Sequence, residues 1–295
     1  MNSQSRKGII LAGGIGTRLF PLTLATSKQM LPVYDKPMIY YPLTVLMLAG
    51  IIEILVIVKP DDISQFKALL GDGSQWGLKI SYKEQLKPEG LAQSFILAEE
   101  FLDGCPSVLI LGDNIFHSIG LEKNLNAASK KNIGATIFGH HVSDPEHYGV
   151  VEFDEGKNII SIEEKPKKPK SNYAITGLYF MDETASERAK LVKPSDRGEL
   201  EITSLLESYK NDNTLDIQLL GRGCAWFDTG THSSLFEASS YIKTMTQRQN
   251  LQIGSPDELA YFLGLIDRSE LNDRYILFKK SDYGNYLKEV ISRTE

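Results

Sequence analysis

Two cationic and two carboxylate side chains stand where this chain could hold phosphate groups. Arg18 and Lys28 follow the glycine-rich stretch "LAGGIG", which begins where an apolar run ends. Asp113 and Asp228 each come after another apolar run, far apart in the sequence. If the fold brings them together, two carboxylates and phosphate oxygens offer the hard oxygen ligands that Mg²⁺ prefers. The glycine turn and the two cations therefore point to an anionic ligand, whereas the sequence spacing alone cannot show that the two aspartates meet.

The glycine-rich turn itself favours an anion. Gly13, Gly14 and Gly16 let backbone N–H groups approach a ligand, and adjacent N–H groups form an anion-binding nest. Arg18 adds a planar fork that matches phosphate oxygens. The third glycine of a dinucleotide fingerprint is absent, and no lysine stands where a P-loop needs one. A plain strand-to-helix turn without a ligand is the alternative.

The composition is that of an ordinary globular chain of 295 residues, 42% hydrophobic and 24% charged. A net charge of −6 and a pI of about 5.5 argue against a general nucleic-acid or membrane-surface binder. No run of about 18 apolar residues predicts a membrane helix, and the polar first residues predict no secretory signal. Cys105 and Cys224 lack metal-ligand spacing and suit a reducing cytoplasm as inert, buried thiols. The histidines show no zinc-binding pair.

Short apolar runs alternate with helical patterns through the first half. Strands are predicted at Lys7–Leu11, Glu53–Val58, Lys79–Lys83, Ser107–Leu111 and Ala135–Gly139, and helical segments at Met38–Leu48, from Pro60 onward, and at Gly90–Leu102. This alternation predicts βαβ units in a mostly parallel sheet. Such sheets bind ligands at the carboxyl ends of their strands, where the glycine turn and Gly112-Asp113-Asn114 lie.

The rest of the chain changes character. Strands are predicted at Val150–Phe153, Ile159–Glu163, Ala174–Phe180, Leu215–Leu219 and Gly223–Phe227, and helices at Glu199–Tyr209, at Thr231–Arg248 and in two or three shorter segments after it. No internal repeat and no linker marks a domain boundary. The prediction is one α/β domain with inserted strands and a helical C-terminal part.

Six stretches, in order, resemble the sugar-1-phosphate nucleotidyltransferases over nearly the full length. They are "LAGGIGTRLFPLT" with "SKQMLPVYDKP", Gln85-x-x-Pro88-x-Gly90-Leu91-Ala92-Gln93, Gly112-Asp113-Asn114, Tyr148-Gly149, Glu163-Glu164-Lys165-Pro166 and Trp226-Phe227-Asp228-Thr229-Gly230-Thr231. The Ser27–Pro32 run is similar to the glucose-1-phosphate thymidylyltransferase branch. The resemblance implies a Rossmann-like α/β fold with a mixed, mostly parallel sheet flanked by helices. It also implies a nucleotide-binding half at about 1–140, sugar-binding strands at about 141–230 and a helical oligomerisation segment at about 231–295.

The resemblance implies transfer of a thymidylyl group from dTTP to α-D-glucose 1-phosphate, with pyrophosphate released and Mg²⁺ as cofactor. Because the attacking sugar phosphate is already an anion, catalysis would be mainly positioning and charge neutralisation. The implied catalytic residues are Arg18, Lys28 and Asp113, and the implied metal ligands are Asp113 and Asp228. The implied nucleotide-binding residues are Leu11, Gly13, Gly14, Gly16, Thr17, Arg18, Lys28, Gln29, Gln85, Gly90 and Asp113. The implied sugar-phosphate site consists of Tyr148, Gly149, Glu164, Lys165 and Tyr179.

Gln85 and Gly90 are the implied base-reading positions. A glutamine amide matches the imide edge that thymine and uracil share, so a uridylyltransferase or broad-specificity enzyme stays open as an alternative. A non-catalytic regulatory homologue is a second alternative. The presence of every charged residue that the resemblance implies for catalysis argues against it.

The family also implies a cytoplasmic homotetramer that serves dTDP-rhamnose and lipopolysaccharide biosynthesis. A second, inhibitory nucleotide site near the subunit contacts belongs to the same expectation. Two departures from the usual pattern concern that region. The run Ile115–Ser118 lacks the usual glycine, and the C-terminal "SPDELAYFLGLI" differs from the usual form.

Overall fold

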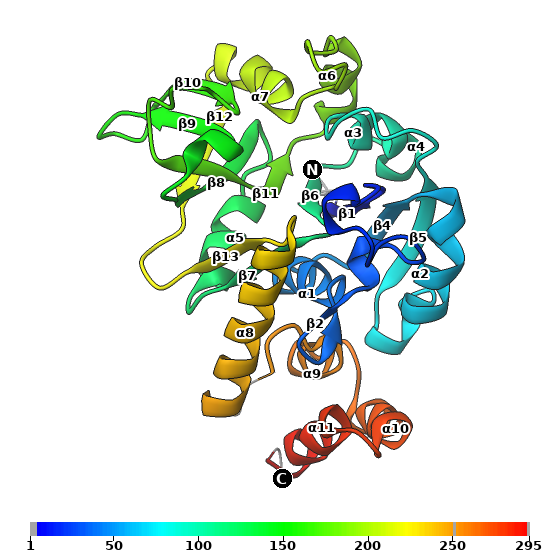
Figure 1. The fold of residues 1–295 in the computed structure, drawn as a ribbon. Helices are drawn as coiled ribbons and strands as arrows, with labels where there is room; N and C mark the ends of the chain where they lie inside the picture. The colour runs from blue at the N-terminus through cyan, green and yellow to red at the C-terminus, as the bar shows by residue number, and fades with distance from the viewer. Residues whose placement is uncertain (1–4, 250–251, 294–295) are drawn as a thin grey trace.

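The computed structural model describes residues 5–249 and 252–293, and its centre is one large mixed sheet covered by helices (Figure 1). Residues 1–4, which belong to the polar N-terminal stretch expected to carry no signal, lie outside the described residues. Within the described part of the chain, no helix combines the length and apolar character needed to cross a membrane. The predicted fold class, an α/β chain with a central sheet flanked by helices, is confirmed.

The strand order of the sheet is β10-β9-β11-β6-β1-β4-β5. The strands are β1 (Lys7–Ala12), β4 (Glu53–Val58), β5 (Lys79–Glu84), β6 (Ser107–Leu111), β8 (Ala135–His141), β9 (Gly149–Phe153), β10 (Ile159–Glu164), β11 (Tyr173–Met181) and β12 (Leu215–Leu219). β6, β1, β4 and β5 are parallel, so their carboxyl ends meet at one edge. β11 is antiparallel to β6, β8 and β9 and joins the parallel half to the inserted strands.

Two short ribbons stand apart from this sheet. β2 (Pro32–Val33) pairs with β3 (Lys36–Pro37), and β7 (Asn114–His117) pairs with β13 (Ala225–Asp228), both antiparallel. β7 is absent from the sequence prediction because it follows β6 after only two residues, where the sequence indicates a turn. This second ribbon becomes important below, since it leads out of the Gly112-Asp113-Asn114 turn.

Helices cover both faces of the sheet because successive strand residues point to opposite sides. On β1, Ile10 belongs to the core under α1, α2 and α5, whereas Ile9 belongs to the core under α3, α6 and α7. The helices are α1 (Tyr40–Leu48), α2 (Ile63–Leu70), α3 (Gln93–Leu97), α4 (Glu99–Leu102), α5 (Leu121–Ser129), α6 (Ala185–Leu191), α7 (Ile202–Asn211), α8 (His232–Gln249), α9 (Pro256–Phe262), α10 (Arg268–Phe278) and α11 (Asp282–Arg293).

Several helix boundaries differ from the prediction. The segment Gly90–Leu102 begins as a helix only at Gln93 and divides at Ala98 into α3 and α4. Gly90 has φ +106°, which is incompatible with a helix and places it against the backbone of Leu200. Helices α5 and α6 are not in the prediction. The first carries buried apolar residues at helical spacing (Leu121, Leu125 and Ala128), a signal the sequence contains.

The expectation that both cysteines are buried is only partly met. Cys105 and Cys224 are free thiols, and both are half-buried. Burial raises the pKa of the Cys224 thiol to about 11, so this group stays protonated near neutral pH. An unreactive role for Cys224 therefore fits its surroundings.

The C-terminal helices are fastened to the sheet domain by one buried carboxylate. Asp257 of α9 is fully buried and accepts hydrogen bonds from Trp76 Nε1 at 3.0 Å and from Tyr283 OH at 2.7 Å. Arg274 of α10 completes its partners as an ion pair. One side chain therefore connects the turn before β5 with α9, α10 and α11, and its removal leaves several donors unpaired.

The substitution Asp257→Ala should lower the free energy of unfolding by about 3 kcal/mol or more, since it leaves the partly buried Arg274 and two hydrogen-bond donors without this partner. Urea unfolding followed by tryptophan fluorescence measures this loss. Asp273→Ala, an exposed aspartate on α10, is the control and should change the stability by less than about 0.5 kcal/mol. Equal midpoints for the Asp257 variant and the unaltered chain would refute the role assigned to this carboxylate.

Candidate active site

The β7–β13 ribbon brings the two predicted metal-ligand carboxylates together. Asn114 pairs with Asp228 in the ribbon register, so Asp113 and Asp228 lie at the same end of it. Thr229 reinforces this end, because its hydroxyl and its backbone N–H both donate to the Asp113 carbonyl, at 2.8 and 3.2 Å. The fold thus places the two aspartates close together although they are far apart in the sequence.

Lys28 binds Asp113 directly. It belongs to a short 3₁₀ helix, Lys28–Met30, and its side chain is only 7% exposed against 21% for Asp113. Lys28 Nζ donates to Asp113 Oδ2, and Asn114 Nδ2 donates to Asp113 Oδ1 at 3.0 Å. Asn114 is fixed in turn, since its Oδ1 accepts from Trp226 Nε1 at 2.7 Å and from the Gly177 N–H at 3.1 Å. Both oxygens of Asp113 are therefore held in place.

The two carboxylates titrate in opposite directions. Burial alone would raise the pKa of Asp113, but the charge and hydrogen bond of Lys28 outweigh it and hold that pKa below its usual value. Burial, followed by the negative charge of Asp113, raises the pKa of Asp228 to about 6. Lys28, Arg18 and Lys165 offset this effect only in part. The positive charges near the two aspartates are therefore too weak to keep the pKa of Asp228 at its ordinary value while Asp113 is ionised.

This carboxylate pair fits a hard divalent cation. No cluster of three or more histidine, cysteine, aspartate or glutamate side chains suitable for a metal occurs within residues 5–249 and 252–293. Asp113 and Asp228 could therefore supply only part of a coordination shell. Mg²⁺ is commonly bound by one or two carboxylates plus substrate phosphates and water, which is the donor set available here.

The glycine turn lies beside these groups at the carboxyl end of β1. Gly16 adopts φ +70°, and its carbonyl accepts from the Thr23 hydroxyl at 2.8 Å. Gly14 and Thr17 are exposed, so their backbone faces solvent and is open to a ligand. Leu11 is a half-buried residue near the end of β1, and its carbonyl accepts from the Gly112 N–H at 2.9 Å, which joins this turn to the Asp113 turn.

Arg18 extends from the turn toward the carboxylates. A Cβ added at Gly230 would lie 2.8 Å from its guanidinium, so the missing side chain at Gly230 makes room for it. Gln29, buried beside Lys28, packs in the same way against Gly112 and accepts from the Ser27 hydroxyl at 2.7 Å. Lys28 thus pairs with Asp113, and the charges of both Arg18 and Lys28 act on Asp228.

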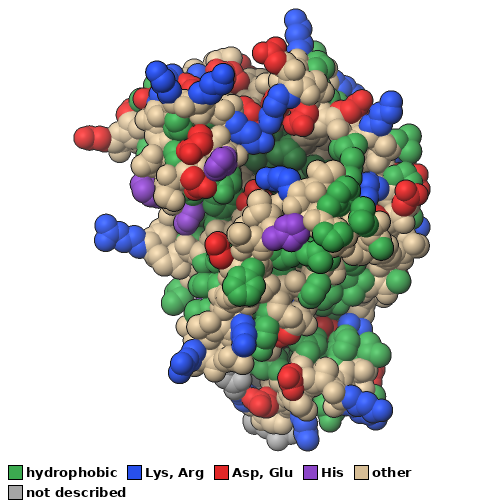
Figure 2. All heavy atoms as spheres, in the orientation of Figure 1, with side chains coloured by type: hydrophobic (Ala, Val, Ile, Leu, Met, Phe, Trp, Pro, Cys, Tyr) green, Lys and Arg blue, Asp and Glu red, His purple; other side chains and the backbone are tan. Residues whose placement is uncertain are grey.

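A cavity of about 180 Å³ opens next to Asp228. Its lining includes Arg18 and all the residues predicted for a sugar phosphate, namely Tyr148, Gly149, Glu164, Lys165 and Tyr179. Sites for drug-sized ligands span about 300–1,000 Å³, so this cavity suits one small polar molecule. The molecular face drawn in Figure 2 mixes basic and acidic side chains and has no single basic patch.

The carboxylate of Glu164 lies at the centre of this lining. Burial raises its pKa, and Lys165 and Arg197 oppose the shift only in part. Gly149 pairs with Glu164 across β9 and β10, and an added Cβ would lie 3.4 Å from Glu164 Oε2. Lys165 has φ +44° and a half-exposed side chain 3.8 Å from Glu164 Oε1. The cavity therefore presents a carboxylate acceptor that is paired with a half-exposed cation.

Two aromatic residues complete the cavity. Tyr148 contacts Trp226 in a tilted arrangement, with ring centres 5.1 Å apart and the ring planes at 57°, and burial raises the pKa of Tyr148 to about 12. Tyr179 of β11 is buried, and burial, then Glu164 and Asp228, raise its pKa far above the ordinary value. Both hydroxyls stay protonated and can donate to a ligand oxygen.

Three residues of this site are missing from the sequence-based set. Asn114 orients Asp113, Trp226 binds Asn114, and Arg197 donates to Glu164 at 3.3 Å and to Glu201 at 2.8 Å. Asn114 and Trp226 stand in two of the six stretches that carry the resemblance, whereas Arg197 lies outside all six. The stretches pointed to the right loops, whereas the supporting contacts depend on the tertiary structure.

Gln85 and Gly90, the predicted base-reading positions, lie on the other side of the glycine turn. Gln85 is buried, and its Oε1 lies against Gly13, where an added Cβ would be 1.8 Å away. A Cβ on Gly90 would lie 2.4 Å from the Leu200 carbonyl. Packing against Leu200 thus already requires glycine at position 90, whether or not this residue also contacts a base.

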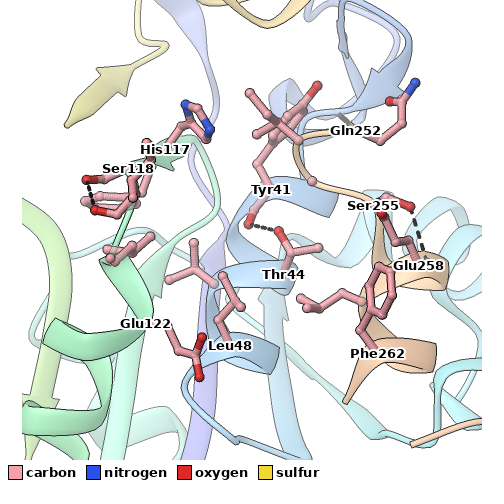
Figure 3. A pocket seen from close by; sticks show the side chains of 18 residues that line it. Tyr41, Thr44, Leu48, His117, Ser118, Glu122, Gln252, Ser255, Glu258 and Phe262 are labelled. Carbon is pink, nitrogen blue, oxygen red and sulfur yellow. Dashed lines mark hydrogen bonds between the residues drawn. The ribbon is translucent and has the colours of Figure 1, made fainter. Parts of the chain in front are cut away.

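A second, separate cavity of about 390 Å³ lies between α1, the β7–α5 loop and α9 (Figure 3). Both segments that depart from the family pattern contribute to it, through His117, Ser118, Glu258 and Phe262. Within residues 5–249 and 252–293, the lining of this cavity includes Glu122 and Glu258 but no lysine or arginine. The expected inhibitory nucleotide site stays a prediction.

Comparisons with known proteins match most of this chain. The nucleotidyl transferase family matches residues 7–245. Glucose-1-phosphate thymidylyltransferases from Xanthomonas campestris and Neisseria gonorrhoeae are 55% and 54% identical over 98% and 97% of this chain, and over 98% and 100% of their own length.

Two solved structures are similar in fold. A chain from Bacillus anthracis, assigned as a glucose-1-phosphate thymidylyltransferase and solved with sucrose, has a TM-score of 0.75 and 40% identity over 80% of this chain and 95% of its own. A UDP-glucose pyrophosphorylase solved with UDP-glucose has a TM-score of 0.71 and 25% identity, over 82% of this chain and all of its own.

The raised pKa of Asp228 makes a prediction about stability. In the folded chain its pKa of about 6 exceeds the ordinary 3.8, so the folded state loses stability as pH rises from about 4 to 6. Asp228→Asn avoids this penalty and should be more stable than the unaltered chain above pH 6, by up to about 3 kcal/mol. Urea unfolding at pH 4, 6 and 8 in the presence of a chelator measures the difference.

The advantage of Asp228→Asn should disappear near pH 4, where the folded chain already holds the proton. Asp61→Asn, at an exposed position between β4 and α2, should show no such pH-dependent gain. An Asp228 variant that is less stable than the unaltered chain at pH 8 would contradict the charge balance described here.

Proposed function

We propose that this chain, which belongs to the nucleotidyl transferase family, transfers a thymidylyl group from dTTP to α-D-glucose 1-phosphate and releases pyrophosphate. The names of relatives about half identical over nearly the whole chain support this reaction. The main structural support is the convergence of Lys28, Asp113 and Asp228 beside the small polar cavity. A phosphate-binding turn and a sugar-sized cavity then share one pair of carboxylates.

The reaction would proceed by in-line attack of the sugar phosphate oxygen on the α-phosphorus of dTTP. The sugar phosphate needs no deprotonation, so the chain's own residues mainly bind and orient. Arg18 would bind the leaving pyrophosphate, and Lys28, positioned by Asp113, would neutralise charge near the α-phosphate. Asp113 and Asp228 would hold Mg²⁺, which supplies charge stabilisation for the phosphate oxygens when bound.

The cavity residues would orient the sugar. Glu164 would accept from sugar hydroxyls, and Lys165, with Arg197 beside it, would attract the phosphate. The hydroxyls of Tyr148 and Tyr179 are available as donors to the same ligand. Glu164 ends β10 and Tyr179 belongs to β11, so the sheet would hold these two groups in place beside Asp228.

A uridylyltransferase or a broader specificity is the second candidate. The fold similarity to a UDP-glucose pyrophosphorylase favours it, because Gln85 would meet an imide edge common to thymine and uracil. A non-catalytic regulatory role has no comparable support, since the charged residues of the site are present and in contact.

The same proposal includes a homotetramer located in the cytoplasm that supplies dTDP-rhamnose and lipopolysaccharide synthesis. Exposed apolar side chains in the C-terminal helical segment support self-association. Among them Phe236 is 71% exposed, Phe262 61% and Leu277 66%.

Pyrophosphate release from purified protein with glucose 1-phosphate and Mg²⁺ tests the reaction. We expect the highest kcat/KM with dTTP, a lower value with UTP, and little release with ATP or GTP, whose purine rings present different edges. A control without the sugar phosphate should release nothing. Equal or faster release with UTP would transfer the assignment to the second candidate, and no release with any nucleotide would refute both.

The carboxylate pair should be indispensable for turnover but not for folding. Asp113→Asn and Asp228→Asn should each lower kcat by about 10³-fold or more, since each removes a charge that binds the cation next to the reacting phosphate. Circular dichroism confirms that each variant is folded, and Asp61→Asn is the matched control with full activity. Substantial Mg²⁺-dependent turnover by the Asp228 variant would disprove the metal assignment.

A further inference from the structure

The amide of Gln85 has two ends in different surroundings, at the border of the glycine turn. Gln85 directly follows β5 and is 2% exposed. Its Oε1 lies against Gly13, and its Nε2 donates to Gln93 Oε1 at 2.7 Å. The orientation of this amide therefore decides whether an acceptor or a donor faces the turn.

Partners with fixed roles determine that orientation. The two ends of a glutamine amide are nearly identical in shape and are distinguished by their partners. The Glu89 carboxylate only accepts, so the end of Gln93 that it meets at 2.8 Å must be Nε2. The backbone N–H of Glu89 only donates, so the end that it meets at 3.1 Å must be Oε1. Gln93 Oε1 then needs a donor from Gln85, and that donor is Nε2.

The backbone around Glu89 is itself held in place. The Glu89 carbonyl accepts from the Leu200 N–H at 2.6 Å, and the Leu200 carbonyl accepts from the Ala92 N–H at 3.0 Å. Gly90, with φ +106°, lets the two segments approach this closely. The segment before α7 thus fixes the donor that orients Gln93.

We propose that Gln93 is a positioning residue that sets nucleobase specificity by holding the Gln85 amide with its acceptor toward the bound base. This inference rests on the proposed function, in which Gln85 meets the base. Thymine and uracil present an N3–H donor beside a carbonyl acceptor, whereas cytosine presents an N3 acceptor beside an amino donor. Gln85 Oε1 and the second Nε2 hydrogen match the first pattern, and a rotated amide matches the second. Gln93 therefore disfavours cytosine nucleotides without touching the substrate.

The test compares kcat/KM for dTTP and dCTP, each with glucose 1-phosphate and Mg²⁺, by pyrophosphate release. Gln93→Leu removes the acceptor that holds Gln85, and we expect the dTTP-to-dCTP ratio to fall about tenfold or more. The loss should appear mainly in KM for dTTP, because the chemical step is unchanged. Gln93→Met repeats the test with an unbranched side chain, should Gln93→Leu fold poorly.

An exchange of the two partners provides the rescue. In Glu89→Gln with Gln93→Glu, the new carboxylate at position 93 still accepts from Gln85 Nε2, and the new amide at position 89 donates to it. This double variant should restore the ratio toward that of the unaltered chain. Gln75→Leu is the matched control, since the Gln75 amide donates to the Leu70 carbonyl outside the site, and it should leave the ratio unchanged.

The outcomes separate this inference from the proposed function. A purely structural role for Gln93 would lower turnover of dTTP and dCTP equally, so an unchanged ratio in an active Gln93→Leu or Gln93→Met variant overturns the inference alone. Failure of the exchange to restore the ratio also counts against it. An unaltered chain that releases no pyrophosphate from dTTP overturns the proposed function and this inference together.

Discussion

The proximity of Asp113 and Asp228 is the constraint around which the rest of the site is arranged. Two carboxylates at one end of a ribbon repel each other, and burial strengthens the repulsion because little water screens it. The structure resolves this unequally, since Asp113 has Lys28 and Asn114 as partners while Asp228 has a pKa raised to about 6. An acidic pair with one strongly paired member is a natural position for an added cation.

This arrangement depends on contacts that no single segment contains. Asn114 can orient Asp113 only because β13 contributes Trp226 and β11 contributes the Gly177 N–H. The pairing of β11 with β8 is irregular between Ile175 and Tyr179, and Gly177 lies within that interval. The irregularity thus leaves the Gly177 N–H available to Asn114, whereas in a regular strand it would bond to the neighbouring strand.

The sequence was a good guide to the parallel half of the sheet and to the loops that carry the site. Continuous apolar runs such as Glu53–Val58 have one simple interpretation, a strand buried on both faces. Gly90 was harder to interpret, because its φ and its approach to Leu200 involve a segment more than a hundred residues away. The partners of Asn114 and the role of Arg197 cannot be predicted for the same reason, whereas the helical spacing of the buried residues in α5 is a local signal that the sequence contains.

In the proposed function, charged side chains would bind the phosphates, and neutral hydrogen bonds would recognise the base. Phosphates can be bound by a few local cations even in a chain of net charge −6, since Arg18, Lys28 and Lys165 all influence the same carboxylate. A nucleobase carries no charge, so its recognition depends on which end of an amide faces it. An amide can rotate at little cost unless its partners have fixed roles. The backbone N–H and carboxylate of Glu89 have such roles, and they allow a neutral side chain to distinguish one base edge from another.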